Sequence, residues 1–352
     1  MHAGREELSK PAWSGDQLDS ASPPEIETPY FDEILKAWVL SRHADILAAF
    51  RASNLSPASP NSNKVSEPID ESGRLKMRAE TMEALSPTQL RAWREQLTAE
   101  ACACVQSLPL EEPVDLLDAY ARPLCLSLAA MVTGISRHDA AGLCARAERV
   151  SAAAAEPYDA ALRRGAKAAN VELRSCFHSG PEPLRDSGFV ALSQTMPCIL
   201  GNAWFALMHH PQEWSLLHRQ PGLMEQAVEE LLRYAGLVRI LIRTATADID
   251  LNGCFIRKGE RIILRIIAAN HDPARFSNPN QVDVTRRGAG HFTLGYGSHS
   301  CVGASLIRMA AVTITQPLLE RFAAAKPARR VAWQGGTGFR SPSSLWVCLS
   351  EV

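Results

Sequence analysis

Apolar residues recur every three or four positions over most of this chain, the spacing at which side chains share one face of a helix. The pattern predicts a short helix at residues 44–50 and a series of longer ones. The longer ones cover about residues 73–84, 87–107, 113–133, 137–154, 157–177, 188–209, 212–219, 222–235 and 302–324. We therefore expect a mainly α-helical protein.

A smaller β-rich part is predicted before the last of these helices. Asn252-Gly253, flanked by apolar residues, suits the two positive-φ positions of a type I′ hairpin turn. Residues 261–267 are rich in isoleucine and residues 37–40 are apolar, so both segments predict strands. Residues 54–70, rich in Ser, Pro and Asn, predict a loop.

The amino-acid composition mainly excludes classes of protein and partner. At roughly 150 residues per domain, the 352 residues allow one large domain or two ordinary ones. With 37 basic and 38 acidic side chains, nothing favours nucleic acid or an anionic membrane as a partner. No apolar run approaches the ~18 residues of a membrane helix, and the first 28 residues lack the apolar core of a signal peptide. Nine cysteines, an odd number, are too few for a disulfide scaffold, so we expect a cytoplasmic protein.

The densest glycine pattern surrounds one cysteine. Gly295, Gly297 and Gly303 lie close to Cys301, directly before the last predicted helix. The start of a helix offers free amide groups and a positive dipole end, which stabilise a thiolate. The residues leave three readings open: a metal ligand, a nucleophile, or a buried cysteine in a tight turn. A zinc site needs about four ligands, and only His299 is nearby.

The sequence Gly295-x-Gly297-x-His299-x-Cys301-x-Gly303 resembles the haem-binding loop of the cytochromes P450, the haem-thiolate monooxygenases. The resemblance implies haem b (iron protoporphyrin IX) as the cofactor. It also implies that Cys301 is the axial thiolate ligand of the iron. Leu294 stands where the family usually has phenylalanine, which implies looser packing over the thiolate.

Glu230 and Arg233 resemble the Glu-x-x-Arg pair of the same family's K helix. Their i, i+3 spacing places both side chains on one helical face. Taken alone, such a pair is commonly a solvated salt bridge. Here apolar residues flank it, so we expect at least partial burial, which requires further partners. Arg286 matches the arginine that completes this network in the family.

Further residues match cofactor-binding positions by resemblance. Arg243 matches the strand arginine that pairs with a haem propionate, and His299 belongs to the haem-binding loop itself. Arg78 matches the arginine of the family's C helix, where Arg74 replaces a histidine. Because Arg74 and Arg78 are four residues apart, both guanidinium groups face the same way and can meet carboxylates bidentately. Each arginine taken alone would more often be a surface charge.

Residues 189–210 resemble the family's I helix, which lines the oxygen-binding face of the haem. Thr195 matches the threonine that assists proton delivery, while Gln194 replaces the usual acid and Leu192 replaces a glycine. An amide cannot ionise, so Gln194 cannot act as a titrating acid or base. Pro197 removes one helical hydrogen bond. It either supplies the kink that glycine would allow or simply bends a buried helix.

The resemblance covers nearly the whole chain and implies a mainly α fold with a small β-rich part. A single large domain over residues 31–352 would enclose the haem, preceded by a loose arm at residues 1–30. Residues 134–190 are few for the family's F, G and H helices. Segments 138–150 and 159–177 can supply F and G, but little remains for H. We therefore predict a shortened distal lid over an open or mobile pocket.

The resemblance implies an enzyme that activates dioxygen and oxidises, most simply hydroxylates, a small organic molecule. No flavin or iron–sulfur segment is visible, so a ferredoxin and its reductase would supply the electrons. Secondary-metabolite biosynthesis is a plausible setting by analogy. Alternatives are a haem-binding scaffold that recruits a carrier-bound substrate, a peroxide-using or non-hydroxylating haem enzyme, and a haem-free helical protein. Candidate pocket-lining residues are Leu192, Ser193, Val238, Ile240 and Leu241.

Overall fold

The computed structural model describes residues 26–57, 71–177, 181–288 and 290–351. The α-helices are α1 (His43–Arg51), α2 (Glu71–Ala84), α3 (Pro87–Gln106), α4 (Arg122–Thr133), α5 (Arg137–Ala155), α6 (Ala160–Arg174), α7 (Asp186–Val190), α8 (Met196–Met208), α9 (Pro211–Arg219), α10 (Met224–Tyr234), α11 (Ile266–Asn270) and α12 (Ala304–Arg321). The strands are β1 (Tyr30–Asp32), β2 (Ala37–Leu40), β3 (Leu55–Pro57), β4 (Val114–Asp115), β5 (Ile240–Ala245), β6 (Ile249–Leu251), β7 (Cys254–Ile256), β8 (Arg261–Arg265), β9 (Ala324–Pro327), β10 (Trp333–Gly335), β11 (Arg340–Pro342) and β12 (Trp346–Ser350). The mainly α fold class is confirmed.

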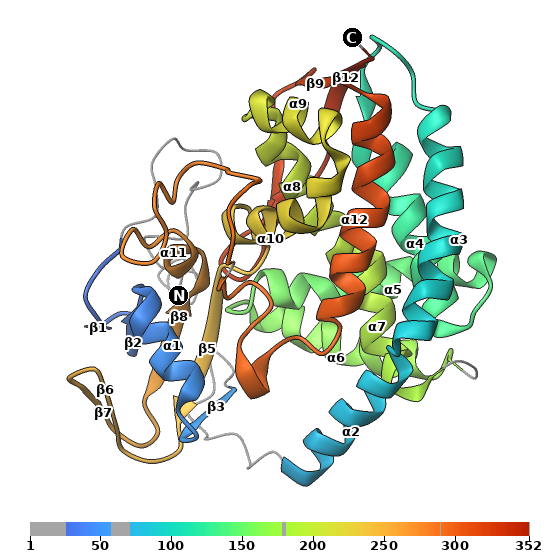
Figure 1. Ribbon diagram of the computed structural model, residues 1–352. Coiled ribbons are helices and arrows are strands. Elements are labelled where there is room, and N and C mark those ends of the chain that lie inside the picture. The colour runs from blue at the N-terminus through green and yellow to red at the C-terminus, as the bar shows by residue number, and fades with distance from the viewer. Residues whose placement is uncertain (1–25, 58–70, 178–180, 289, 352) are drawn as a thin grey trace, which may run out of the picture.

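The helices pack around a core centred on α8 and α12, with α3 and α10 against α12 (Figure 1). Two buried aromatic side chains fix the packing by donating hydrogen bonds. Trp204 Nε1 donates to Thr315 Oγ1 at 3.1 Å, and Tyr120 Oη donates to the carbonyl oxygen of Ile314 at 2.9 Å. Since each aromatic polar atom has a partner, burying these large rings carries no desolvation penalty from an unpaired group.

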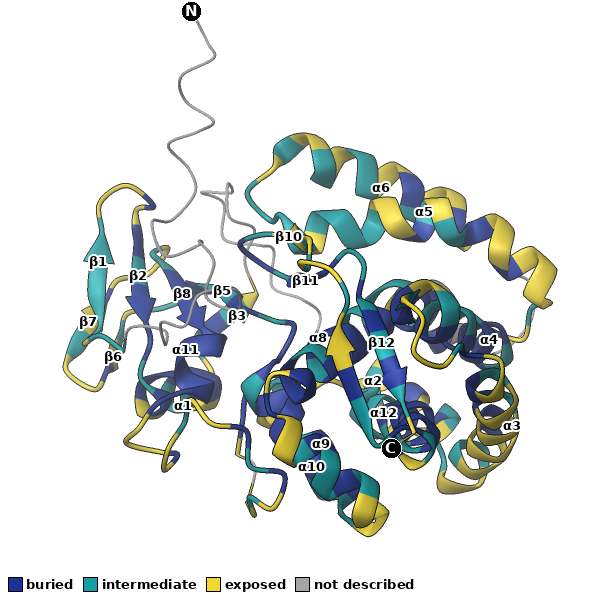
Figure 2. Cartoon of the chain, turned by 90° about the horizontal axis from the view of Figure 1, so that it is seen from above, coloured by how far each residue is buried: buried dark blue, intermediate teal, exposed yellow. Residues whose placement is uncertain are grey.

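The β-rich part lies beside the helices, with α1 and α11 packed close to it (Figure 2). Its main sheet has the strand order β1-β2-β8-β5-β3; β2 and β8 are parallel and the other pairs antiparallel. The β6–β7 hairpin turns at Asn252 (φ 54°) and Gly253 (φ 88°), as the sequence predicts. Smaller sheets join β4-β12-β9 and β10-β11.

The structure corrects three boundaries of the sequence-based expectation. The strand predicted at residues 261–267 ends at Arg265, and Ile266–Asn270 forms α11. The helix predicted from residue 113 is preceded by strand β4. The predicted loop at residues 54–70 contains β3, which pairs with β5. In each case a partner distant in sequence decides the conformation, so local propensity is insufficient.

Two helices contain a π-helical turn, and both turns precede a proline. Residues Leu117–Ala121 lead into α4 with Pro123, and Ala191–Thr195 lead into α8 with Pro197. A proline has no N–H to donate to the carbonyl four residues earlier, and its ring clashes with that carbonyl. A wider π turn removes the conflict, so the N–H of Met196 bonds to the carbonyl of Ala191 instead.

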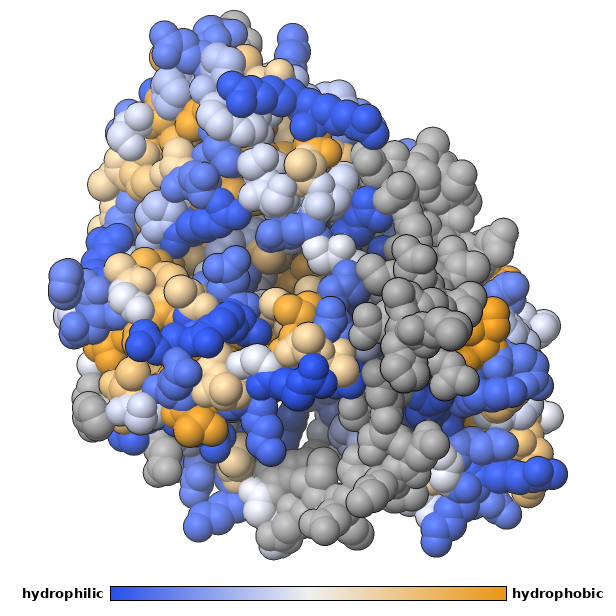
Figure 3. Space-filling model, turned by 180° about the vertical axis from the view of Figure 1, so that it is seen from behind, coloured by the Kyte–Doolittle hydropathy of each residue, from blue (hydrophilic) through white to orange (hydrophobic). Residues whose placement is uncertain are grey.

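The surface mixes polar and apolar residues, as the face in Figure 3 shows. Exposed large apolar side chains include Leu75, Met77 and Met82, all on α2. Among the described helices, none is by itself long and apolar enough to cross a membrane. The segments Leu117–Thr133 and Arg137–Ala155 meet that test of length and composition only as a pair, which is bent by 105°.

Candidate functional site: a cysteine loop and a neighbouring cavity

The loop before α12 folds tightly around Cys301. The Cys301 N–H donates to the carbonyl of Leu294 at 2.6 Å, and residues Gly297–His299 form a 3-10 turn. Gly295 has φ 74°, and a Cβ there would overlap the backbone carbonyl of His299. Glycine is required at this position by both backbone angle and space. The sequence-based reading of a glycine-built loop entering a long helix is therefore confirmed.

The Cys301 thiol is exposed, yet surrounding protein atoms raise its pKa by desolvation. The Gly303 N–H and the charges of Arg78 and Arg308 lower the pKa but do not outweigh that effect. The stabilisation of a thiolate expected from the helix start is therefore opposed by desolvation. A bound cation would favour the ionised form of Cys301. In the described part of the chain, no three His, Cys, Asp or Glu residues cluster as a multi-ligand metal site.

The predicted cofactor-binding residues approach this loop to different degrees. Arg78, on α2, donates from its two terminal nitrogens to Ser300 O and Ser300 Oγ, both at 2.7 Å, which places it beside Cys301. His299 lies in the loop. Arg243 lies on β5, and its printed hydrogen bond goes to the carbonyl of Ile242 at 3.0 Å. The backbone of Arg74 is in α2, but its side chain lies outside the described part.

Arg243 bears on whether a haem fits. Burial lowers the pKa of its guanidinium, and among the described residues no carboxylate pairs with it. A half-buried cation without an anion is costly, and a propionate would supply one. Together with an accessible thiol in a glycine-built loop, this leaves donors of the right chemistry for an iron porphyrin carrying two carboxylates.

Behind the loop, Glu230 and Arg233 form the predicted buried pair. Arg233 Nε lies 2.7 Å from Glu230 Oε2, and the two side chains are 0% and 1% exposed. Arg286 Nε also donates to Glu230 Oε2, at 2.9 Å. Arg233 further donates to the carbonyl oxygens of Asn270 and Pro279. The prediction of a buried network completed by Arg286 is confirmed.

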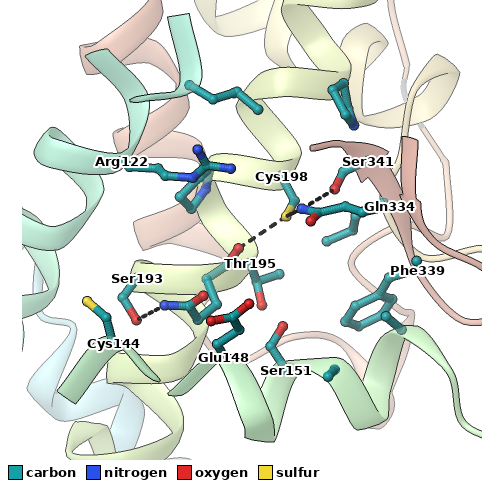
Figure 4. Close-up of a pocket in the computed structure, with 18 of the residues that line it drawn as sticks. Arg122, Cys144, Glu148, Ser151, Ser193, Thr195, Cys198, Gln334, Phe339 and Ser341 are labelled. Atoms are coloured by element: carbon teal, nitrogen blue, oxygen red, sulfur yellow. Dashed lines mark hydrogen bonds between the residues drawn. The ribbon is translucent and has the colours of Figure 1, made fainter. Parts of the chain in front are cut away.

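A cavity of about 790 Å³ lies between α5, the segment from Ala191 to Cys198, and the β10–β11 hairpin (Figure 4). Thr195, Gln194 and Ser193 all line it. Leu192 is instead buried in the core, and Val238, Ile240 and Leu241 are not among the described lining residues. Leu237, one position earlier than the predicted strand residues, does line the cavity.

The cavity and the cysteine loop meet at one tight contact. Cys301 is not among the described residues that line the cavity. Gly236, however, precedes the lining residue Leu237, and a Cβ at Gly236 would overlap Thr293 Oγ1 of the cysteine loop. Thr293 is also held by its hydrogen bond to the Leu232 carbonyl at 2.6 Å. The two parts of the site are therefore neighbours through the α10–β5 connection.

The polar residues on the cavity wall are held by their own backbone. Ser193 Oγ donates to the carbonyl of Phe189 at 2.7 Å, and the Gln194 amide contacts Ser193 Oγ at 3.4 Å. The Cys198 thiol donates to the Gln194 carbonyl at 3.2 Å. Pro197 follows directly after the π turn, so its effect is a widened helix rather than a simple bend.

Helices α5 and α6 cover the two segments that the resemblance assigns to the F and G helices of the lid. In the described residues between α6 and the π turn at Ala191–Thr195, the helical elements are the 3-10 turn Glu182–Leu184 and the five-residue α7, which leaves little for an H helix, as expected. The end of α5 is docked on the β10–β11 hairpin: Gly338 N–H donates to the Ala155 carbonyl at 2.9 Å. The C-terminal end of α5 is therefore fixed to the hairpin, while the open or mobile pocket stays a prediction. Residues 58–70 lie outside the described part.

Substitution of Gly338 by alanine is expected to loosen this docking. A Cβ at Gly338 would overlap the Ala154 carbonyl, and such overpacking costs about 1–3 kcal/mol. Amide hydrogen exchange at the end of α5 should become faster. The matched control is Gly142→Ala, on the same helix with no atom within 4 Å of the added Cβ. That control should stabilise the helix by about 0.5–1 kcal/mol. Equal exchange in the two variants would contradict the docking role.

Some cavity residues were not anticipated from the sequence. Glu148 and Ser151 reach the cavity from one face of α5, and Phe339 reaches it from the β10–β11 hairpin. The i, i+3 spacing of Glu148 and Ser151 was the available signal, but it does not say which way the face points. The local sequence does not predict that Phe339 lines the cavity, because its position depends on a pairing with Val238, about a hundred residues earlier.

Comparison with known proteins shows which sequences this chain resembles. The sequence model of the cytochrome P450 family matches residues 212–332. Cytochrome P450 CYP107DY1 of Priestia megaterium is 44% identical over 129 residues, 37% of this chain and 32% of that protein. The 20-oxo-5-O-mycaminosyltylactone 23-monooxygenase of Streptomyces fradiae is 40% identical over 140 residues, 40% of this chain and 33% of that protein. The aligned part thus spans about a third of the length of these relatives.

The likeness in structure extends over nearly the whole chain. The crystal structure of P450BioI in complex with hexadec-9Z-enoic acid ligated acyl carrier protein matches with a TM-score of 0.80. The match has 23% identity and covers 92% of this chain and 95% of that one. Members of the matched family bind haem b, with a cysteine thiolate as the iron ligand. The cysteine loop and the buried Glu230–Arg233–Arg286 network agree with this likeness: the fold is that of the cytochromes P450, and residues 212–332 match the sequence model of that family.

Proposed function

We propose that this chain is a haem-thiolate monooxygenase acting on a small organic substrate. The net reaction combines substrate, dioxygen, two electrons and two protons, and gives an oxygenated product and one water. The accessible Cys301 thiol in its glycine-built loop is the observation that carries the proposal. The Streptomyces relative named above, a monooxygenase, supports it. When bound, the haem would supply the chemistry that activates dioxygen.

The residues of this chain would have separate roles in binding haem and in ordering water. Cys301 would ligate the iron, and Arg78, Arg243, His299 and Arg74 would hold the propionates by charge-assisted hydrogen bonds. Thr195 and Gln194 would order water at the cavity wall, since a hydroxyl and an amide can both donate and accept. Their place on the wall of the 790 Å³ cavity supports that role. Gln194 itself would carry no ionisable proton.

We further propose a ferredoxin and its reductase as the electron donors, and a single haem domain over residues 31–352 located in the cytoplasm. All nine cysteines, each of which is described, are free, which supports a reducing location. Biosynthesis of a secondary metabolite is the proposed setting, by analogy with the Streptomyces enzyme.

Spectroscopy and turnover together test the proposal. The reduced holoprotein under carbon monoxide is expected to show a strongly red-shifted Soret band. Absence of that band in folded, haem-loaded protein would reject thiolate ligation. Turnover should require dioxygen and a ferredoxin–reductase pair; turnover with peroxide alone would favour the peroxide-using alternative. A red-shifted band without any turnover, together with binding of an acyl-loaded carrier protein, would favour the scaffold alternative. P450BioI was itself crystallised with a carrier protein.

Replacement of Thr195 by alanine is expected to uncouple electron use from product formation. The change removes one hydroxyl from the cavity wall, and loss of a proton-transfer group typically costs about 10²-fold or more. The fraction of consumed NADPH recovered as product should therefore fall, while the red-shifted band persists. Thr98→Ala, on the outer face of α3, is the control. Unchanged coupling in Thr195→Ala would remove Thr195 from the mechanism.

A further inference from the structure

Most charged side chains at the cavity have a visible partner. Arg122 contacts Asp118 and donates to the Ser343 carbonyl at 2.9 Å. Arg137 lies 3.5 Å from the carboxylate of Glu100. These cationic groups are therefore already neutralised within the protein and are poor sites for an anionic ligand.

Two more charged groups are engaged at the hairpin. The guanidinium of Arg340 lies 5.0 Å from the centre of the Trp333 ring. The Glu156 carboxylate fills the space beside Gly336, where a Cβ would overlap it. Both side chains thus take part in packing the hairpin against the end of α5.

Glu148 differs from these residues. It is an exposed residue of α5 that lines the cavity, and Figure 4 shows its carboxylate turned toward Thr195 and beside Ser151. Within the described residues, no hydrogen bond or ion pair reaches this carboxylate. Its electrostatic neighbour is Cys144, one turn earlier, whose thiol pKa is raised by burial and, to a smaller degree, by Glu148. A neutral thiol does not compensate the negative charge.

The rest of the lining is suited to an apolar body. Leu237, Phe339, Pro197 and Leu162 come from four separate segments and face the same space. A volume of 790 Å³ is within the usual range of small-molecule sites, about 300–1,000 Å³. The cavity therefore joins an apolar wall to one unpaired carboxylate.

We propose that the substrate is an organic cation, a protonated or quaternary amine whose charge lies at Glu148 and whose apolar part contacts Leu237 and Phe339. This inference rests on the proposed function for its catalytic meaning. An unpaired carboxylate favours a cation and repels an anion of the same shape, which provides discrimination that an apolar wall alone cannot give. The hydroxyls of Ser151 and Thr195 would accept hydrogen bonds from a protonated amine.

Calorimetric titration of the purified holoenzyme with two matched probes tests the inference. Benzyltrimethylammonium and neopentylbenzene have the same shape and differ by one positive charge, and a quaternary nitrogen has no lone pair with which to ligate iron. Wild-type protein is expected to bind the cation about five-fold more tightly, the scale of a partly exposed ion pair. Glu148→Gln should remove the preference without changing the affinity for the neutral probe. Glu95→Gln, the same charge change on the exposed face of α3, should retain it.

Each other outcome has a fixed meaning. Equal affinities in the wild type, or a preference that survives in Glu148→Gln, would overturn the inference. Lost coupling in Glu148→Gln with unchanged affinities would also overturn it and assign Glu148 to proton transfer. The carbon monoxide spectrum of the same preparation judges the proposed function separately. A red-shifted band without a cation preference rejects only the substrate class, and a preference without that band rejects only the monooxygenase.

Discussion

The Arg233→Met variant is expected to lose about 3–5 kcal/mol of folding free energy, the cost of removing one partner from a buried ion pair. Arg233 is fully buried and donates to Glu230 and to the carbonyl oxygens of Asn270, Pro279 and Gln281. Without it, the Glu230 carboxylate would keep only Arg286 and the Asp283 N–H. Since the free energy of unfolding of a domain is typically about 5–15 kcal/mol, this single change could remove most of it.

Chemical denaturation of purified protein measures this effect. The midpoint should fall steeply for Arg233→Met. The control Arg149→Met removes a guanidinium that lies 2.9 Å from Glu172 with both side chains about half exposed. It should change the unfolding free energy by less than about 1 kcal/mol. If Arg233→Met is too unstable to purify, Arg286→Met, whose side chain is 11% exposed, should give an intermediate loss. Equal stability of Arg233→Met and Arg149→Met would contradict the structural role of the network.

The Cys301→Ala variant is expected to fold normally but to lose the red-shifted carbon monoxide band and nearly all turnover. Cys301 is exposed and lies outside the hydrophobic core, so its removal leaves no buried cavity. Loss of a hydrogen-bond partner of a metal ligand typically costs about 10–100-fold in affinity or activity. Loss of the ligand should therefore reduce turnover by more than about 100-fold.

The matched control is Cys102→Ala, which removes another exposed thiol, on α3. It should retain the band and the activity. Thermal unfolding of both variants should resemble that of the wild type, which separates loss of ligation from loss of fold. Retention of the red-shifted band in Cys301→Ala would transfer the thiolate role to another cysteine and remove the basis of the proposed function.

The parts of this structure that follow from local sequence were the predictable ones. Helix α10 and its Glu230–Arg233 pair lie within one periodic segment, and the Asn252-Gly253 turn fixes its own hairpin. The cysteine loop was also readable, because Gly295 must adopt a positive φ. Local signals of this kind do not depend on the remainder of the fold.

The remaining features depend on contacts between distant segments. Strand β4 pairs with β12 across more than two hundred residues, β9 pairs with the other edge of β12, and none of the three is strongly patterned. The cavity residue Glu148 is one of several exposed charges on its helix, and only packing of α5 beside Ala191–Thr195 shows which of them borders the cavity. The same holds for Leu237, where the predicted lining was shifted by one to several positions.

The two proline-linked π turns also change how the helical pattern should be counted. A turn that holds one additional residue shifts the angular phase of everything before it by about one position relative to everything after it. Both turns border the cavity, through Leu117 and Asp118 in one and Ser193 to Thr195 in the other. Three consecutive side chains can thus share one wall, which a regular helix would spread over more than half its circumference. Helical wheels drawn through either proline would assign these side chains to the wrong side.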